Sequence, residues 1–575
     1  MPTRPKSEPS RLARVLAAAQ SATRGFPWRV FRWVAAAATL VISPFFFLGN
    51  ASGHDFEFHL ASWMEVVQHW HQWVFYPRWA EWANAGFGEP RFIFYPPLSW
   101  LAGGALGLVL PWDMVPGAFI WIALVVAGLS AYRLAKLWLP DRDALLAAVL
   151  YAVNPYHLVI VYYRSDFAEL IASALFPLLL WGVIELARQG WPRLPFFAAI
   201  YALIWLSNAP AAVISTYVIA LIAAVQYVRT RSPQVVLRVA SGGALGIALV
   251  AFYIFPAWYE QRWVDINGAL TTQLLPWNNF LFAHADDPEF VLFNWKVSAV
   301  AVLVLALFGI SAVFAARYRK ERGDVFWPLF ATGLAAVVLM FPATRIIWAD
   351  APELKFVQFP WRWLLPLGAV ACVLFAVAAA PLRRRWIPWT AIFVCLATLA
   401  GWMMTNNWWD SLDAAYLNVV ITRRIGYEGT DEYVPIGSDR YSLPSDPKDL
   451  TALEPETQKP IGNIPFRTGV QRWDAENKSF RVHVEQPVLL VLRLFPYPAW
   501  RAFVNGAAAK IESYGDGGQA MLAIPAGRNR VELRFVRTWD RTAADIVSAI
   551  ALLSFLWLRR RLWRGERGEA VGGAA

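Results

Sequence analysis

The sequence predicts an α-helical polytopic membrane protein with one β-rich domain close to its C-terminus. Three observations predict this fold class. Of the 575 residues, 58% are hydrophobic and 32 are tryptophan, a composition too apolar for an ordinary soluble protein. Apolar runs long enough to cross a bilayer recur along most of the chain. Between the last two runs lie roughly 135 residues of different character, in short segments separated by glycine-containing turns.

The distribution of charge excludes a nucleic-acid-binding protein. The net charge is +11, but the arginines lie in short clusters between apolar runs rather than in one basic domain. This placement is typical of a membrane protein whose basic loops stay in the cytoplasm. The two cysteines, Cys372 and Cys395, both fall inside apolar runs. The sequence therefore predicts two inert thiols, without a disulfide framework or a cysteine metal site.

The N-terminal part sets the orientation. Residues 1–29 are basic without a sustained apolar run, and we expect a cytoplasmic tail. The first span, 31–49, resembles an uncleaved signal anchor, although Gly49-Asn50-Ala51 also permits cleavage. The first outer loop then covers 51–114. Its run 98–111 is short enough for an interfacial or re-entrant segment, and we predict that it does not span, because spanning would move every later basic loop outside.

The rest of the membrane domain follows the same rule. With the first span it gives about 12 spans and places both termini in the cytoplasm. The membrane domain is expected over 30–404, and the last span with a basic cytoplasmic tail over 541–575. The remaining predicted spans are 115–132, 144–161, 168–187, 194–208, 211–228, 236–254, 297–316, 325–342, 362–380, 386–404 and 543–558.

The polar stretch 53–97 of the first outer loop carries the strongest functional signal. Apolar residues recur at helical spacing over 56–74, with polar residues on the other side. This pattern predicts an amphipathic helix that lies on the membrane surface. The closing sequence AGFGEPRFIFYPP predicts a shaped loop at the rim of a pocket. Acids and imidazoles begin directly after the first span, where the bilayer meets water: His54, Asp55, Glu57 and His59.

A second set of polar residues lies at the predicted outer ends of later spans. Taken singly, each could just cap a helix or extend to the interface. Together with the first loop they form a mixed-charge surface at the outer membrane boundary, as expected for binding an anionic lipid-linked substrate. The set comprises Arg164, Asp166, Glu169, Asn208, Glu260, Asp265, Lys355 and Arg362.

Residues 405–540 are expected to form an extracytoplasmic β-sandwich domain. Short runs, several with alternating apolar residues, lie between turns such as Asn505-Gly506 and Gly515-Asp-Gly-Gly. These features predict a compact sandwich. The first part, 405–465, is irregular and acidic, and we expect it to cover the membrane site. The runs are FRVHVE, VLLVLRLF, WRAFVNG, AKIES, AMLAIP and RVELRFV.

Several features resemble those of known membrane proteins over almost the whole chain. An acidic residue after the first span, a long first outer loop, a polar motif after a later span and an outer C-terminal domain resemble the GT-C superfamily of membrane glycosyltransferases. More closely, the chain resembles bacterial multi-pass proteins labelled "6-pyruvoyl-tetrahydropterin synthase-related", although it has none of the architecture of a soluble zinc lyase. This second resemblance rests on GHDFEFH, GFGEPRFIFYPP, YRSDFAE, FPAWYE, FPWRW and FPYPAWRAFVNG.

The resemblance implies a GT-C-like membrane domain and a glycosyltransferase of the bacterial inner (cytoplasmic) membrane. Such an enzyme moves a sugar from a polyprenyl-phosphate donor to a cell-envelope glycan, lipid or protein acceptor on the outer face. The reaction needs a carboxylate that accepts the proton of the acceptor hydroxyl, cations that hold the departing phosphate, and a groove open to lipid. Membrane lipid is thus a further expected partner, and nucleic acid is not.

Asp55 is the expected general base, and Glu57 is the second catalytic candidate. The competing interpretation of Asp55 is an N-cap of the amphipathic helix. His54 and His59 could bind zinc with an acid, but histidines in such a loop more often form hydrogen bonds. Metal use stays open: a divalent cation could bridge Asp55 and Glu57, but the motif is not a plain Asp-x-Asp. The expected substrate-binding residues are His54, His59, Arg164, Asp166, Glu169, Glu260 and Arg362.

Two other classes of function compete with a glycosyltransferase. A transporter or lipid flippase would need ionisable residues near the middle of the bilayer and broken helices in matched halves, whereas the central spans are nearly free of charge. A non-catalytic receptor or assembly factor would bind through the β-rich domain, but it has no need of Asp55 at the edge of the bilayer. Consumption of a polyprenyl-phosphate sugar would distinguish these classes.

Overall fold

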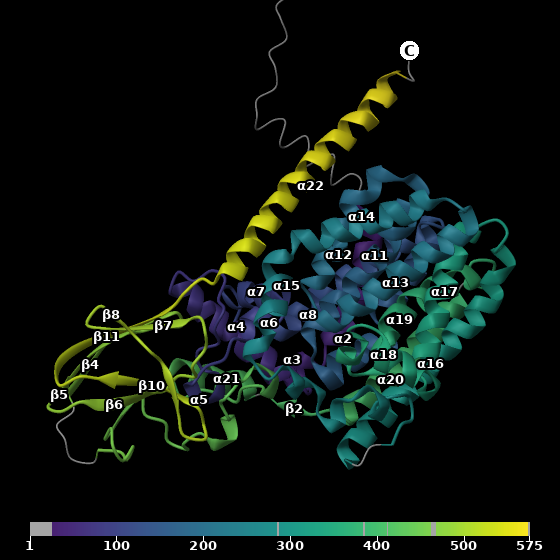
Figure 1. Ribbon diagram of the computed structural model, residues 1–575. Coiled ribbons are helices and arrows are strands. Elements are labelled where there is room, and N and C mark those ends of the chain that lie inside the picture. Colours follow the sequence, from purple (N-terminus) through teal and green to yellow (C-terminus); the bar gives the residue numbers. More distant parts are fainter. Residues whose placement is uncertain are drawn as a thin grey trace, which may run out of the picture.

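The computed structural model of the chain describes residues 26–284, 287–382, 384, 386–410, 412–461 and 467–572. Figure 1 shows a large body of packed helices with a β-rich domain beside it, and the long helix α22 (Trp539–Gly572) projecting away from both. Residues 1–25 of the predicted basic tail lie outside the described residues, as do Arg383 and Arg385 of one basic loop and 573–575.

Membrane-spanning helices form most of the helical body. The described part of the chain contains nine helices that are long and apolar enough to cross a membrane, or up to eleven if each of two bent pairs is one span. The chain is therefore a multi-pass membrane protein. The nine are Trp28–Leu48 (α2, Trp28–Ile42, and α3, Phe45–Leu48), α8 (Val115–Ala135), Asp141–Arg164 (α9, Asp141–Ala152; α10, Pro155–Val159; η1, Ile160–Arg164), α11 (Phe167–Gln189), α13 (Ala209–Thr230), Pro288–Tyr318 (α16, Pro288–Ala315, and η7, Ala316–Tyr318), Pro360–Ala379 (η10, Pro360–Trp363, and α19, Leu364–Ala379), α20 (Trp386–Thr405) and Trp539–Leu562.

The two bent pairs correspond to two further predicted spans. α14 (Pro233–Leu249) is followed by α15 (Ala251–Glu260) at 74°, and α17 (Gly323–Leu339) by α18 (Arg345–Asp350) at 93°. The predicted span 194–208 is instead the 12-residue helix α12 (Leu194–Trp205). A helix of that length covers about 18 Å, less than the about 30 Å of a hydrocarbon core. The described part of the chain therefore holds up to eleven candidate spans, where the sequence predicts about 12.

Helix α4 (Phe56–His71) corrects the prediction of an amphipathic helix on the membrane surface. It is buried within the protein, because α7 (Pro97–Gly107) packs on one side and α21 (Asp413–Thr422) on another. Glu65 and His69, which helical spacing assigns to the polar side, are 0% and 1% exposed. The 11-residue helix α7 is too short to span, as predicted for 98–111.

Two antiparallel sheets form the β-rich domain, as expected for a sandwich. The strand orders are β3-β6-β10-β9 and β4-β5-β11-β7-β8. Alternate residues of β5 (Asn477–Val484), Phe480, Val482 and Val484, point into the core, which is the pattern of a half-buried strand. The other strands are β3 (Leu450–Leu453), β4 (Arg467–Trp473), β6 (Val488–Leu492), β7 (Trp500–Val504), β8 (Ala507–Ala509), β9 (Glu512–Tyr514), β10 (Gln519–Ile524) and β11 (Gly527–Phe535).

The stretch between the last two spans begins with short elements that contact the first loop. β2 (Trp409–Asp410) pairs with β1 (Asn50–Ala51), and Ser52 Oγ donates a hydrogen bond to Asp413 Oδ2 at 2.5 Å. Farther along, the N–H of Ala85 donates to the carbonyl of Tyr427 at 3.0 Å. Contacts from Trp409, Asp413 and Tyr427 thus cover parts of the first loop.

Candidate active site

Segments from three parts of the chain meet where candidate spans end, and they bring most of the predicted site residues together. Asp55 lies directly before α4, shortly after the first candidate span. Arg164 is the last residue of another candidate span, and Asp166 immediately precedes α11. Arg362 lies in the 3₁₀ turn η10, which opens a further span. The convergence expected from the sequence is therefore present for these four residues.

The turn between Arg164 and α11 has an unusual local structure. The helix before it ends in the π-helical turn η1, a form that is frequent at functional sites. Ser165 then adopts a left-handed backbone with φ of 53°, which reverses the chain. Asp166 caps α11, because its Oδ1 accepts the N–H of Glu169 at 2.9 Å. This turn therefore directs Arg164 and both acids toward one place.

Gly53 lets the first loop approach this turn closely. A Cβ at Gly53 would lie 2.6 Å from backbone atoms of Tyr163 and Arg164, too close for any side chain. The N–H of Gly53 donates to Ser165 Oγ at 3.0 Å, and the N–H of Asp55 donates to the carbonyl of Arg164 at 2.9 Å. One backbone bond and one bond to the Ser165 hydroxyl therefore hold Asp55 beside Arg164.

The side chains form one network of ion pairs. Arg164 Nη2 donates to Asp55 Oδ2 at 3.0 Å and lies 3.2 Å from Asp166 Oδ2. Arg164 Nη1 donates to Glu169 Oε2 at 2.6 Å, and Arg362 Nε donates to the same oxygen at 3.0 Å. Arg362 Nη2 is 3.5 Å from Asp166 Oδ2. Every member except Asp55 is at most 6% exposed. We call these five residues the ionic network.

The charge balance of the ionic network determines what it can bind. Two guanidinium cations face three carboxylates, so no positive charge is left over for a phosphate. Buried charges of this kind are stable only while their partners remain in place. We therefore interpret Arg164 and Arg362 as groups that position the acids, and not as free ligands of a substrate phosphate.

The surroundings keep Asp166 of the network ionised. Burial disfavours the charged form of Asp166, but the charge of Arg164, a hydrogen bond from His59 and the charge of Arg362 outweigh it and hold the pKa of Asp166 well below its ordinary value. Arg362 also lies 4.9 Å from the centre of the Phe359 ring, a cation–π contact. Asp166 is therefore ionised at neutral pH and can pair with both arginines.

Asp55 is the most exposed member of the ionic network, with 37% of its side chain open. It occupies the N-cap position of α4, yet its side chain makes no capping hydrogen bond. Its carboxylate is turned to Arg164 instead. This is the arrangement of a carboxylate that is oriented by a cation and accessible to the proton of a substrate. Glu57 is exposed on α4 and forms no ion pair with the network.

The two histidines have different surroundings. His59 is 1% exposed, with Nε2 3.6 Å from Asp166 Oδ1 and Nδ1 3.2 Å from Ser99 Oγ, so it is a hydrogen-bonded residue behind the network. The His54 ring lies 4.6 Å from that of Phe293. Burial of much of the imidazole lowers the pKa of His54; the charge of Asp55 opposes this shift and the charge of Arg164 adds to it.

The arrangement does not fit a preformed metal site. Among the described residues, no group of three or more His, Cys, Asp or Glu side chains is placed to hold a metal ion. Asp55 and Asp166 both pair with Arg164. The divalent cation that the sequence allows between Asp55 and Glu57 thus finds no ready set of ligands.

Glu260 is not part of the ionic network, which corrects its assignment as a substrate-binding residue. It is 0% exposed and accepts hydrogen bonds from Arg541 Nε at 2.6 Å and from the Tyr497 hydroxyl at 2.7 Å. These bonds connect α15 to α22 and to the β-rich domain, so Glu260 has a structural role. The other polar residues at predicted outer span ends cap a helix or lie exposed: Asn208, Asp265 and Lys355.

Sequence patterns miss several residues around the ionic network. The Tyr156 hydroxyl donates a hydrogen bond to Glu169, and the Ser99 hydroxyl is hydrogen-bonded to His59. The partners in each pair are too far apart in sequence for a periodic pattern to connect them. Lys296 of α16 has its Nζ 5.2 Å from the centre of the Tyr163 ring. Its position at the edge of an apolar run could have marked Lys296 as functional, because a charge is costly in a membrane.

Comparisons with known proteins find likeness in structure and none in sequence. No protein-family model and no curated protein sequence matches the chain. Arabinofuranosyltransferase AftD from mycobacteria is 17% identical over 65% of this chain and 27% of its own, with a TM-score of 0.39. An Archaeoglobus fulgidus oligosaccharyltransferase is 14% identical over 70% and 56%, with a TM-score of 0.37. ArnT from Cupriavidus metallidurans is 14% identical over 64% and 62%, with a TM-score of 0.40.

This chain thus spans between 27% and 62% of the length of these three chains. Identities of 14–17% and TM-scores of at most 0.40 do not assign it to their family.

Proposed function

We propose that this protein is a membrane glycosyltransferase of the GT-C kind, which moves a sugar from a polyprenyl-phosphate donor to an acceptor on the outer face of the membrane. The observation that carries the proposal is the Asp55 carboxylate. It is 37% exposed, held by the buried Arg164 where several candidate spans end, and free of any capping bond. A network that served stability alone would have no need of an open carboxylate at its edge.

In the proposed reaction, the acceptor hydroxyl oxygen forms a bond to the anomeric carbon of the donor sugar. The bond from that carbon to the phosphate oxygen breaks, and its electron pair stays on the phosphate. Asp55 takes the hydroxyl proton as general base and releases it to water. The products are the glycosylated acceptor, polyprenyl phosphate and a proton, so atoms and charge balance.

The departing phosphate needs a cation that is not already neutralised, and Lys296 fits this role. Its Nζ lies over the ring of Tyr163, the residue before Arg164, and it forms no ion pair with any described residue. Leu292 and Trp295 of the same helix are 58% and 50% exposed, as expected of a surface that faces lipid. An unpaired ammonium at this depth supports a lipid-linked phosphate as its partner.

The test is donor consumption by the purified full chain in liposomes. A panel of polyprenyl-phosphate sugars is offered together with cell-envelope fractions as acceptors, and free polyprenyl phosphate is measured by mass spectrometry. Release from at least one donor, absent in protein-free liposomes and with heat-denatured protein, is expected. If every donor of the panel stays intact, the proposed function fails.

A further inference from the structure

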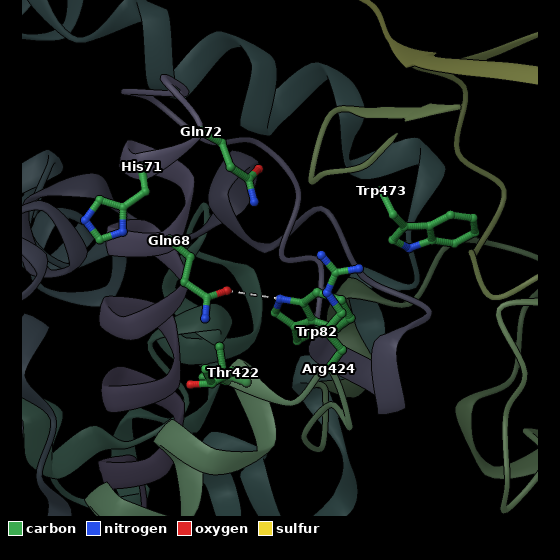
Figure 2. A pocket seen from close by; sticks show the side chains of 8 residues that line it. Gln68, His71, Gln72, Trp82, Thr422, Arg424 and Trp473 are labelled. Atoms are coloured by element: carbon green, nitrogen blue, oxygen red, sulfur yellow. Dashed lines mark hydrogen bonds between the residues drawn. The ribbon is translucent and has the colours of Figure 1, made fainter. Parts of the chain in front are cut away.

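A second polar site lies at the other end of α4, between the first loop, α21 and the β-rich domain. It is a pocket of about 270 Å³. Figure 2 shows the side chains from these three parts that line it. The argument uses six of its lining residues: Gln68, Gln72, Trp82, Thr422, Arg424 and Trp473.

The uncharged part of the lining suits a ligand with many hydroxyl groups. Gln68 Oε1 accepts from Trp82 Nε1 at 3.3 Å, as Figure 2 shows, and Gln72 Oε1 accepts from the N–H of Ala475 at 3.3 Å. Both amide oxygens are thereby held, while the amide NH₂ groups donate to no described residue. The indoles of Trp82 and Trp473 add flat apolar surface to the lining. Hydroxyl oxygens accept from amides, and the C–H faces of sugar rings pack on indoles.

The charged part of the lining adds an unpaired cation. Arg424 is exposed, and its guanidinium lies 5.8 Å from the centre of the Trp82 ring without an ion pair to any described residue. The nearby buried carboxylate of Glu81 is already bonded by Lys478 Nζ at 3.0 Å. Among the described residues, no carboxylate lines the pocket. A guanidinium in this state favours a carboxylate on the ligand, which it can bind through two parallel hydrogen bonds.

We propose that this pocket binds a distal, uronate-bearing unit of an oligosaccharide acceptor. That the bound oligosaccharide is the acceptor rests on the proposed function. That the pocket binds an oligosaccharide does not. Gln68 follows Asp55 by 13 residues, which corresponds to about 20 Å along a helix. A sugar unit in the pocket is therefore remote from the reacting end, and several units must connect the two places. The acceptor class is then an acidic glycan chain, held by contacts far from the chemistry.

The test is direct binding of two hexasaccharides, hexagalacturonate and maltohexaose, to the full chain in nanodiscs, measured by isothermal titration calorimetry. We expect hexagalacturonate to bind the wild type and Asp55→Asn equally, and maltohexaose to bind at least about 10-fold more weakly. Arg424→Ala should weaken hexagalacturonate binding by about 10-fold or more. Arg423→Ala is the matched control, because it removes an exposed arginine one residue away that is not in the pocket lining.

Any of three results would overturn the proposal for this pocket. They are no binding of hexagalacturonate, an equal loss of hexagalacturonate affinity in Arg423→Ala and Arg424→Ala, or maltohexaose binding as tight as that of hexagalacturonate. Failure of the proposed function is a separate result. If hexagalacturonate binds through Arg424 but no donor is ever consumed, the pocket stands and the glycosyltransferase proposal falls. If donors are consumed and no oligosaccharide binds, the glycosyltransferase proposal stands and the proposal for the pocket falls.

Discussion

Asp55 shows how one side chain can satisfy a sequence rule and still serve another purpose. Its position before α4 is that of an N-cap, so the sequence allows both capping and catalysis. The side chain instead accepts a hydrogen bond from Arg164 across 109 residues of sequence. Because the backbone contacts around Gly53 fix this pair, the carboxylate is oriented before any substrate arrives, which is a requirement of efficient general-base catalysis.

Lys296 is the residue at which donor affinity is most directly tested. Replacing it with methionine keeps the length of the side chain and removes the charge. Since a hydrogen bond to a charged group contributes about 1.5–3 kcal/mol, we expect Lys296→Met to raise KM for the donor by about 10- to 100-fold. Lys355→Met, which removes an exposed lysine near the same span ends, should leave KM unchanged. Equal KM values in the two variants would remove Lys296 from the site.

A local motif indicates which polar residues lie near one another, whereas their function stays a prediction. Arg164, Asp166 and Glu169 come from YYRSDFAE and Arg362 from FPWRW, and the structure brings all four together. Glu260 comes from a similar aromatic motif, yet it is bonded to Arg541, 281 residues away. A motif reports local chemistry, but the partner of a buried charge is set by packing between distant segments. For that reason the partners, and with them the roles, were not predictable.

At the scale of elements, the approach of the first loop to η1 is the contact on which the geometry depends. Gly53→Ala places a methyl group against the backbone of Tyr163 and Arg164, so the two segments must separate. A displacement of about 1 Å can cost about 10²-fold in rate, and we expect a loss of that order in donor consumption. Gly401→Ala, at a glycine with nothing within 4 Å of the added Cβ, is the control and should keep full activity. Full activity in Gly53→Ala would show that this contact is not needed.

Helix α4 carries a titratable group whose burial makes stability depend on pH. Burial raises the pKa of Glu65 to about 8 from an ordinary value of 4.5, against hydrogen bonds from the Trp82 N–H and the Tyr427 hydroxyl. Between these two values the unfolded chain loses the proton and the folded chain keeps it. The free energy of unfolding should therefore fall as pH rises from about 5 to 8.

Glu65→Gln removes the titrating group, and with it this pH dependence of the free energy of unfolding. The thermal midpoint of the variant should therefore change less between pH 5 and 8 than that of the wild type. Glu57→Gln alters an exposed glutamate of the same helix and should follow the wild type. The measurement is thermal unfolding in detergent at each pH. Parallel curves for Glu65→Gln and the wild type would contradict the shift.

The same helix shows what hydrophobic periodicity can and cannot predict. Period and length correctly placed α4, most spans and the alternating strands of the β-rich domain, because these signals depend on neighbours in sequence. The prediction that α4 lies on the membrane surface was wrong. Its polar side is covered by segments near Trp82 and Tyr427, and no local sequence pattern connects these segments to the helix. The prediction of a span at 194–208 failed for another reason. An apolar run shows that a segment is hydrophobic but not how much of it is helical, and the 12 residues of α12 are too few to cross a bilayer.

At the scale of the whole molecule, the orientation in the membrane follows from the basic loops and stays a prediction. The positive-inside rule places the β-rich domain outside and the loop around Arg319 inside. In a Cys395→Ala background, a cysteine at Ile436, which is 64% exposed, should react with an impermeant thiol reagent added to intact cells. A cysteine at Arg319 should react only after the cells are opened. The opposite pattern would place the ionic network on the cytoplasmic side.

The most direct test of the central claim is the rate of sugar transfer by Asp55→Asn on a donor that the wild type consumes. Asparagine keeps the shape of the side chain but cannot take the acceptor proton. Loss of a positioned general base typically costs about 10²–10⁴-fold, so we expect transfer to fall at least about 100-fold while membrane insertion and hexagalacturonate binding are unchanged. Glu57→Gln, two residues away and outside the ionic network, should lose far less. Transfer by Asp55→Asn at a rate near that of the wild type would contradict the assignment of Asp55 as the base.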